Sequence, residues 1–155
     1  MSSLKIIPLA ERPDLVGRVV AWGYAEWGHL DPTSTLPERE RRVRASLHVD
    51  CVPCVFIALD PADSLVGTAS LVLDDLEGDP RNPWLASVFV PVEARRRGVA
   101  SALVRACEAA ARQFGHRRLY LFTASAPALY ARLGWRRLER LVYRGEHIQV
   151  MDKAL

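Results

Sequence analysis

The segment Trp84–Phe114 constrains the fold more than any other stretch of the chain. Its first seven residues, WLASVFV, are apolar and β-branched, as expected of a buried strand. Pro91 ends that strand because proline cannot donate to a sheet ladder, and apolar residues then recur at helical spacing. The segment 117–123, RRLYLFT, again has the pattern of a strand. A strand, a helix and a second strand in succession make a crossover, so we expect the two strands to be parallel.

The remaining segments place two helices before this unit and a hairpin after it. Periodicity and turn residues predict helices in 12–28, 37–49 and 126–134, strands in 4–9, 54–60 and 65–75, and a terminal hairpin that turns at 144–146. The strands before Pro91 form an antiparallel meander. The pattern predicts a mixed α/β (α+β) sheet in a single domain, residues 1–155.

Composition excludes several classes of protein. The net charge of +3 and the pI near 9.0 favour anionic ligands only mildly, whereas a nucleic-acid-binding domain is usually more basic and striped. The N-terminus lacks the features of a signal peptide, and no apolar run reaches a membrane span, so we expect a cytoplasmic protein without a membrane partner. The pair Cys51 and Cys54 has no second pair to complete a metal site.

The turn after Pro91 has the features of a phosphate site. Arg95–Arg97 precede Gly98, which allows a backbone geometry that a side chain would forbid, and Ala100 and Ser101 leave the first helical turn uncluttered. The first N–H groups of a helix have no intrahelical acceptor and lie at the positive end of its dipole, so they bind phosphate or pyrophosphate. The glycine patterns of a P-loop and of a Rossmann site do not occur in the sequence.

The pattern R-x-x-G-x-A (Arg95, Gly98, Ala100), preceded by Val-x-Pro, resembles the [QR]-x-x-G-x-[GA] signature of the GNAT family of acetyl-CoA-dependent N-acetyltransferases. The segment ALYARLGW (128–135) is similar to the family's Leu-Tyr-x-x-x-Gly-Phe element, with Trp135 at the aromatic position. The resemblance is carried by residues 66–135. It implies the GNAT fold, a mixed and mostly antiparallel sheet of about seven strands flanked by helices, with a parallel crossover at the cofactor site.

The same resemblance implies acetyl-CoA as co-substrate and no metal. Backbone groups of Val88–Val90 would pair with the pantetheine arm as an added strand would. The N–H groups from Arg96 to Ser101 would hold the pyrophosphate, and Tyr130 would protonate the departing thiolate. Thr123 stands where many relatives have an asparagine. The residues expected to bind the cofactor are Val88, Phe89, Val90, Arg95, Arg96, Arg97, Gly98, Val99, Ala100, Ser101 and Thr123.

The implied reaction is direct attack of a primary amine on the acetyl carbonyl. A backbone N–H near Phe89 or Val90 would stabilise the oxyanion. The segment 84–90 contains no carboxylate, although some family members carry a glutamate there as the general base. The base therefore stays open among Glu26, His29, Asp31, Asp74, Asp75 and Glu77, and a reaction without a dedicated base is a further alternative.

The acceptor also stays open, because family acceptors range from small amines to protein N-termini. We expect a small-molecule amine or a peptide N-terminus as partner, and monomer and homodimer are both compatible with the sequence. The charged segment 38–44, ERERRVR, is either a solvated helix face or a binding surface for an acidic substrate. The alternatives to an enzyme are a non-catalytic acyl-CoA sensor and a basic nucleic-acid-binding module.

Overall fold

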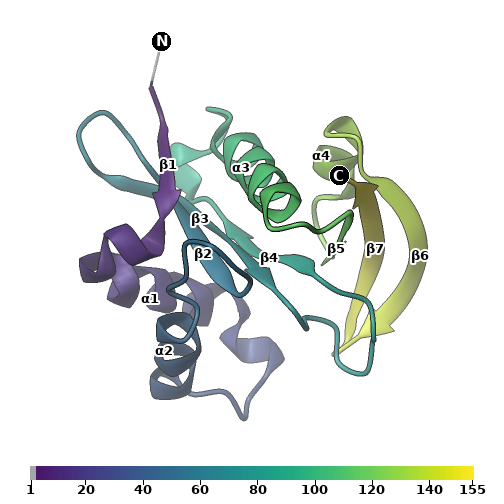
Figure 1. Ribbon diagram of the computed structural model, residues 1–155. Helices are drawn as coiled ribbons and strands as arrows, with labels where there is room; N and C mark the ends of the chain where they lie inside the picture. The colour runs from purple at the N-terminus through teal and green to yellow at the C-terminus, as the bar shows by residue number, and fades with distance from the viewer. Residues whose placement is uncertain (1–2) are drawn as a thin grey trace.

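The computed structural model describes residues 3–155, whose seven strands form one mixed sheet in the order β1-β2-β3-β4-β5-β7-β6 (Figure 1). Neighbouring strands are antiparallel except β4 and β5, which are parallel. The expected mixed sheet with one parallel crossover is confirmed. The strands are β1 (Lys5–Pro8), β2 (Cys54–Leu59), β3 (Leu65–Val72), β4 (Trp84–Phe89), β5 (Arg118–Thr123), β6 (Arg136–Tyr143) and β7 (Glu146–Ala154).

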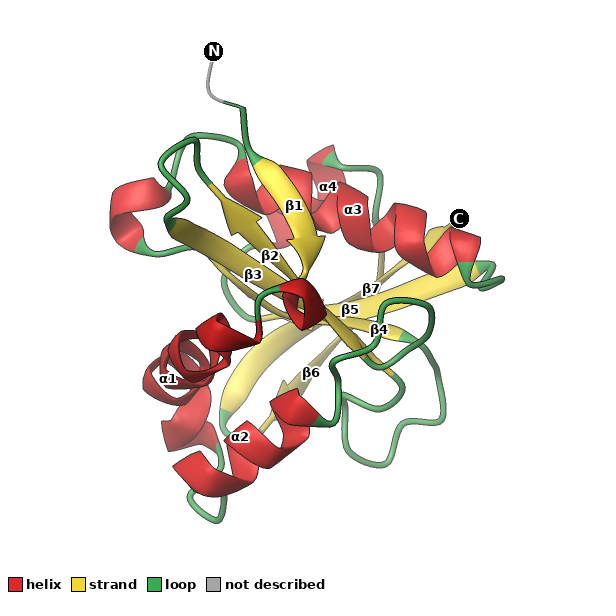
Figure 2. Cartoon of the chain, turned by 60° about the vertical axis from the view of Figure 1, so that its left-hand side comes forward, coloured by secondary structure: helices red, strands yellow, loops and turns green. Residues whose placement is uncertain are grey.

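Helices cover both faces of the sheet. Figure 2 shows α1 and α2 on one side of the strands and α3 with α4 on the other. The α2 helix begins where the Thr35 hydroxyl accepts a hydrogen bond from the Glu38 N–H at 3.3 Å, which caps its first turn. The helices are α1 (Val16–Trp27), α2 (Leu36–Arg44), α3 (Val99–Gln113) and α4 (Pro127–Arg132), with single 3-10 turns at Leu9–Glu11, Pro13–Leu15, Gly28–Leu30 and Val92–Ala94.

The strand β2, which lies between β1 and β3, is buried on both faces, which explains its continuous apolar sequence. Val55 and Ile57 belong to the apolar cluster under α1, together with Val16. Ala58 belongs to the second cluster, with Leu103 of α3. Two apolar layers therefore sandwich the first half of the sheet.

The strands β4 and β5 separate soon after they meet. They pair at one position among the described residues, Trp84 opposite Tyr120, where the Tyr120 N–H donates to the Pro83 carbonyl at 3.1 Å. A β-bulge bends β4 beyond that point. Between the pair Ala86–Ser70 and the pair Phe89–Thr68, β4 contains one more residue than β3, and Ser87 in this stretch has a φ of 54°. The edge of β4 that faces β5 is therefore unpaired from the bulge onward.

Candidate functional site

The turn that connects β4 to α3 presents a row of free backbone N–H groups beside the unpaired part of β4. Arg96 and Gly98 both have positive φ, 63° and 76°. No hydrogen bond between described residues outside the helices and strands uses the N–H of Arg96, Arg97 or Gly98, and no side chain caps α3. The next three N–H groups, of residues 99–101, have no intrahelical acceptor. The turn thus has the electrostatics of an anion site.

The glycine at position 98 is required by backbone conformation. A Cβ added to Gly98 would meet no atom within 4 Å, so space does not exclude a side chain. Its positive φ is the feature that an L-residue adopts only with strain.

The arginines of this turn divide into two roles. The Arg95 Nε donates to the Val90 carbonyl at 2.9 Å and braces the end of β4, whereas Arg96 and Arg97 are exposed and form no ion pair with a described residue.

Tyr130, at the fourth position of α4, is buried in the apolar cluster that also contains Leu85 of β4 and Leu121 of β5. Burial, followed by the proximity of Cys107, raises the pKa of Tyr130 to about 12. The phenol is therefore protonated at neutral pH and can act as a hydrogen-bond donor. The Trp135 ring packs edge-on against it, with the ring centroids 6.2 Å apart.

A buried polar network, which the sequence did not suggest, holds Trp135, the residue that packs against Tyr130. Glu108 of α3 accepts a hydrogen bond from Trp135 Nε1 at 3.0 Å and pairs with Lys153 Nζ at 2.8 Å. The Lys153 ammonium also donates to the Leu133 carbonyl at 2.7 Å. The signal in the sequence was the position of Glu108, which lies four residues after Val104 and three before Ala111 on the apolar face of the helix.

The hydroxyl of Thr123, at the end of β5, is engaged in hydrogen bonds within the turn into α4. Its hydroxyl oxygen accepts hydrogen bonds from the N–H groups of Ser125 and Ala126, at 3.3 and 3.1 Å. Only the hydroxyl hydrogen is then free for a ligand. The same residue lines a hollow of about 510 Å³ over β6 and β7, whose other lining residues are Ala124, Pro127, Arg137, Arg140, Leu141, Val142, His147, Ile148 and Gln149.

On the opposite face of the sheet, aromatic side chains of α1 meet the bulged strand. The Trp22 and Phe89 ring centroids are 5.2 Å apart, and the Trp27 ring contacts Phe89 edge-on at 6.3 Å. Tyr24 is exposed, whereas Trp84 is completely buried and belongs to the core. Trp22 and Trp27 are therefore the tryptophans that border the open part of β4.

Three loops converge on the side of α1 and α2. Arg144, in the β6–β7 turn, lies 3.3 Å from Asp31 and 3.3 Å from Glu77, which come from the α1–α2 and β3–β4 loops. The Tyr143 hydroxyl accepts a hydrogen bond from the Glu77 N–H at 3.2 Å. These contacts hold the loops together and engage two of the candidate bases.

Asp75 differs from the other candidate bases. Burial alone raises the pKa of Asp75 to about 7. By contrast, the hydrogen bond from the Thr33 hydroxyl, aided by Arg144, lowers the pKa of Asp31, which makes that carboxylate a weaker base. The remaining candidates are exposed to solvent: Glu26, His29, Asp74 and Glu77.

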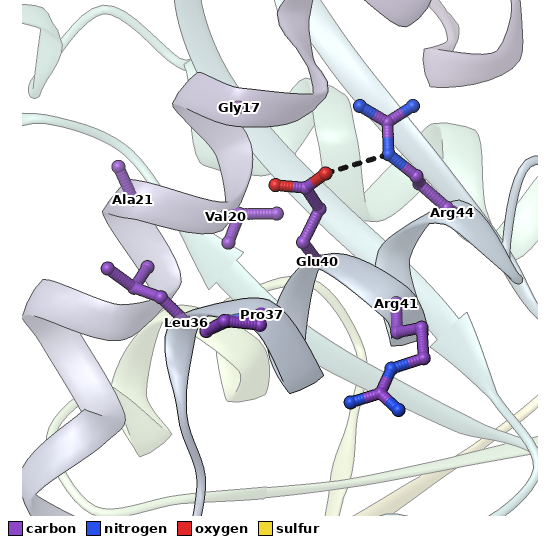
Figure 3. Close-up of a pocket in the computed structure, with 8 residues that line it drawn as sticks. All are labelled: Gly17, Val20, Ala21, Leu36, Pro37, Glu40, Arg41 and Arg44. Carbon is purple, nitrogen blue, oxygen red and sulfur yellow. Dashed lines mark hydrogen bonds and ion pairs between the residues drawn. The ribbon is translucent and has the colours of Figure 1, made fainter.

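A groove of about 470 Å³ between α1 and α2 is a separate feature. Figure 3 shows its lining, in which Val20, Ala21 and Leu36 form an apolar floor. Glu40 pairs with Arg44 across 3.0 Å at its rim.

Within residues 3–155, no cluster of three or more His, Cys, Asp or Glu side chains could hold a metal ion. None of the helices in this range has the length and apolar character that a membrane span requires.

Comparison with known proteins identifies the family. The model of the acetyltransferase (GNAT) family matches residues 17–135, which is more than half of the chain. The splayed strand pair, the free N–H groups before α3 and this match together define the class, and the chain belongs to the GNAT acetyltransferase family. Comparison with curated proteins finds no significant match.

Solved structures of acetyltransferases share the fold at low sequence identity. An aminoglycoside 6'-N-acetyltransferase complexed with coenzyme A has a TM-score of 0.73 and 15% identity, over 97% of this chain and 96% of that chain. A GNAT-family acetyltransferase from Streptococcus pneumoniae has a TM-score of 0.70 and 17% identity, over 99% and 100%. A spermidine/spermine N-acetyltransferase from Vibrio cholerae has a TM-score of 0.66 and 20% identity, over 97% and 92%.

Proposed function

We propose that this protein is an acetyl-CoA-dependent N-acetyltransferase that acetylates a primary amine by direct attack. The observation that carries the proposal is the unpaired edge of β4 next to the free N–H groups of residues 96–101. Family membership supports acyl transfer. The solved relatives named for aminoglycosides and spermidine support an amine as acceptor.

The two halves of the site suit the two halves of acetyl-CoA. The N–H groups before α3, with the charges of Arg96 and Arg97 nearby, bind the pyrophosphate. The unpaired edge at Val88–Val90 offers backbone groups to the amides of the pantetheine arm, in the manner of an added strand. The Val90 carbonyl is already engaged by Arg95, so we assign the pairing to the remaining backbone groups of Val88–Val90 that point to this edge.

The chemical step joins the amine nitrogen to the acetyl carbon and breaks the carbon–sulfur bond. The amine enters from the side of Trp22 and Trp27, opposite to α3. A backbone N–H near Phe89 or Val90 stabilises the oxyanion of the tetrahedral intermediate. The proton lost by the amine goes to a base, and the sulfur leaves as a thiolate that gains a proton.

Tyr130 assists the departure of the thiolate. A phenol with a pKa of about 12 is a weaker acid than an ordinary thiol, whose pKa is about 8.5. Its role is therefore a hydrogen bond to the developing thiolate, whereas complete transfer of its proton would be uphill.

Asp75 accepts the proton of the amine through a water molecule. Its pKa of about 7 makes the carboxylate a stronger base than an exposed aspartate and still leaves it largely ionised in mildly alkaline solution. The assignment is supported by the position of Asp75 in the β3–β4 loop, whose Glu77 pairs with Arg144.

Two measurements test the proposal. We expect acetyl-CoA and CoA to raise the melting temperature, and a panel of primary amines to release free CoA thiol at a rate that depends on the amine. A shift with CoA but no turnover with any amine would identify a non-catalytic sensor. A shift with oligonucleotides and none with CoA would contradict the proposal.

A further inference from the structure

Arg39 has an incomplete set of partners. Among residues 3–155, its Nε is the one buried side-chain nitrogen or oxygen without a hydrogen bond. Buried polar atoms in proteins almost always have a partner, and an exception points to a water, an ion or a ligand. Arg39 also forms no ion pair with a described residue, although it stands in the charged segment of α2.

The guanidinium lies beside the aromatic residues that border the open strand. It stacks over the Tyr24 ring, 6.0 Å from its centroid. A Cβ built on Gly23 would be 3.9 Å from Arg39 Nη1 and 3.9 Å from Trp27 Cε3, so both groups lie beside the same point of α1. The Trp27 ring in turn contacts Phe89. Arg39 therefore lies on the side of α1 from which Trp27 reaches Phe89 of the bulged strand.

The carboxylates near Arg39 are engaged elsewhere. Asp31 accepts a hydrogen bond from the Thr33 hydroxyl at 2.6 Å and pairs with Arg144 at 3.3 Å. Glu38 lies 3.8 Å from Arg42 Nη2. Arginine remains charged even where burial disfavours it, so a positive charge without a counter-ion borders the acceptor side.

We propose that Arg39 binds an anionic group of the acceptor, so that the substrate is a primary amine that also carries a carboxylate or a similar oxyanion. The planar guanidinium matches such a group with two parallel hydrogen bonds. The phosphates of acetyl-CoA are not its ligand, because the free N–H groups at α3 lie on the opposite face of the sheet (Figure 2). This inference rests on the proposed N-acetyltransferase function.

Matched pairs of acceptors test the charge requirement. L-methionine and L-methioninamide, or β-alanine and its amide, present the same amine with and without a carboxylate. The amino group of the amide compound loses its proton more readily than the amino group of the acid, so intrinsic reactivity favours the amide. We expect kcat/KM for thiol release to favour the acid by at least about tenfold, as a charge-assisted pair of hydrogen bonds allows. Equal use of acid and amide by the wild type would overturn the proposal.

Substitutions assign the preference to Arg39. Arg39→Gln should abolish the preference for acids, so that the ratio of kcat/KM for an acid to kcat/KM for its amide falls at least about tenfold. Arg41→Gln is the matched control, because Figure 3 shows Arg41 of the same helix pointing away from Val20 and Ala21 of α1. Equal losses in both variants would remove Arg39 from the site. Arg39→Lys keeps the charge but not the planar guanidinium, so it should retain part of the preference for acids. This variant provides a test even if Arg39→Gln folds poorly.

A binding readout separates this inference from the proposed function. N-acetyl-L-methionine, which cannot react, should raise the melting temperature of the wild type and of Arg41→Gln, but not of Arg39→Gln. Its amide should raise none of them. If no amine is turned over but this pattern is found, the anion site stands and acetyl transfer fails. If turnover occurs but neither ligand distinguishes the variants, the anion site fails.

Discussion

The role of the buried Tyr130 hydroxyl in the reaction can be tested by a substitution that removes only its oxygen atom. We expect Tyr130→Phe to lower kcat by roughly 100-fold and to change the KM for acetyl-CoA little, because the hydroxyl acts on the leaving thiolate and the ring keeps its packing. Steady-state thiol release measures both constants. Tyr120→Phe is the control, since its ring packs on Trp84 at the far end of β4. Equal rates for the two variants would show that the Tyr130 hydroxyl has no part in the reaction.

Asp75 should couple activity to pH. Its carboxyl has a pKa of about 7 in the folded protein, so we expect kcat/KM of the wild type to rise as pH increases through that value. Asp75→Asn should lose most of the activity and this ionisation. Asp74→Asn, at the exposed neighbouring position, should keep the wild-type profile. A profile that survives in Asp75→Asn would assign the base elsewhere.

The same carboxyl should also couple stability to pH. Its folded pKa is above the ordinary value of 3.8, so its favourable contribution is complete below 3.8 and is lost as pH rises through about 7. The wild type should therefore lose stability relative to Asp75→Asn between about pH 4 and about pH 7, and the difference should level off above about pH 8. Melting temperatures across this range measure the difference. Parallel curves would show that Asp75 ionises as easily in the folded protein as in the unfolded chain.

Among the elements, the contact of α3 with β3 sets where the free N–H groups lie. A Cβ at Gly67 of β3 would be 2.8 Å from Val99 Cγ1 and 2.9 Å from Leu103 Cδ1, both in α3. Gly67→Ala should lower the free energy of unfolding by about 1–3 kcal/mol, since the core is overpacked. It should also weaken CoA binding, because we expect the displaced Val99 to shift the first turn of α3.

Urea unfolding and calorimetric titration with CoA measure the two effects. Gly17→Ala in α1 is the matched control, because a Cβ there meets nothing within 4 Å. An alanine inside a helix is favoured over glycine, so this variant should gain about 0.5–1 kcal/mol. If Gly67→Ala binds CoA as tightly as Gly17→Ala does, the position of α3 does not govern the site.

Much of this arrangement of elements could be predicted from the sequence. Local signals are enough for the strand that ends before Pro91, the helix with one apolar face and the strand at 118–123, and the crossover rule makes β4 and β5 parallel. The turn at Gly98 was also predictable, because a glycine before a helix and after a proline is a local signal.

The details that decide the chemistry were not predictable, since they arise between segments distant in the chain. The bulge at Ser87 depends on the register with β3, and no local pattern marks it. The bond of Arg95 to Val90 was hidden because three adjacent arginines looked equivalent. Arg39 and Glu108 stand in charged or amphipathic helices, where only tertiary contacts distinguish a functional side chain from a solvated one.

At the scale of the whole molecule, Glu108 joins three parts of the chain. Its carboxylate holds Trp135 after α4 and Lys153 in β7. Glu108→Ala should lower the free energy of unfolding by about 3 kcal/mol, because it leaves the Lys153 ammonium without its partner. Glu40→Ala, which breaks only the exposed pair with Arg44, should lower it by about 0.5 kcal/mol. Urea denaturation compares the two, and equal changes would show that the buried network contributes no more than a surface pair.

The separation of β4 from β5 divides the sheet's ladder into a block of four strands and a block of three. Those amide hydrogens of Val88–Val90 that point to the open edge should exchange with solvent faster than the amides within either block, because no strand protects them. A ligand seated along that edge would slow their exchange and join the two blocks into one cooperative unit. In the bound state the co-substrate would then serve as an eighth, removable strand of the sheet.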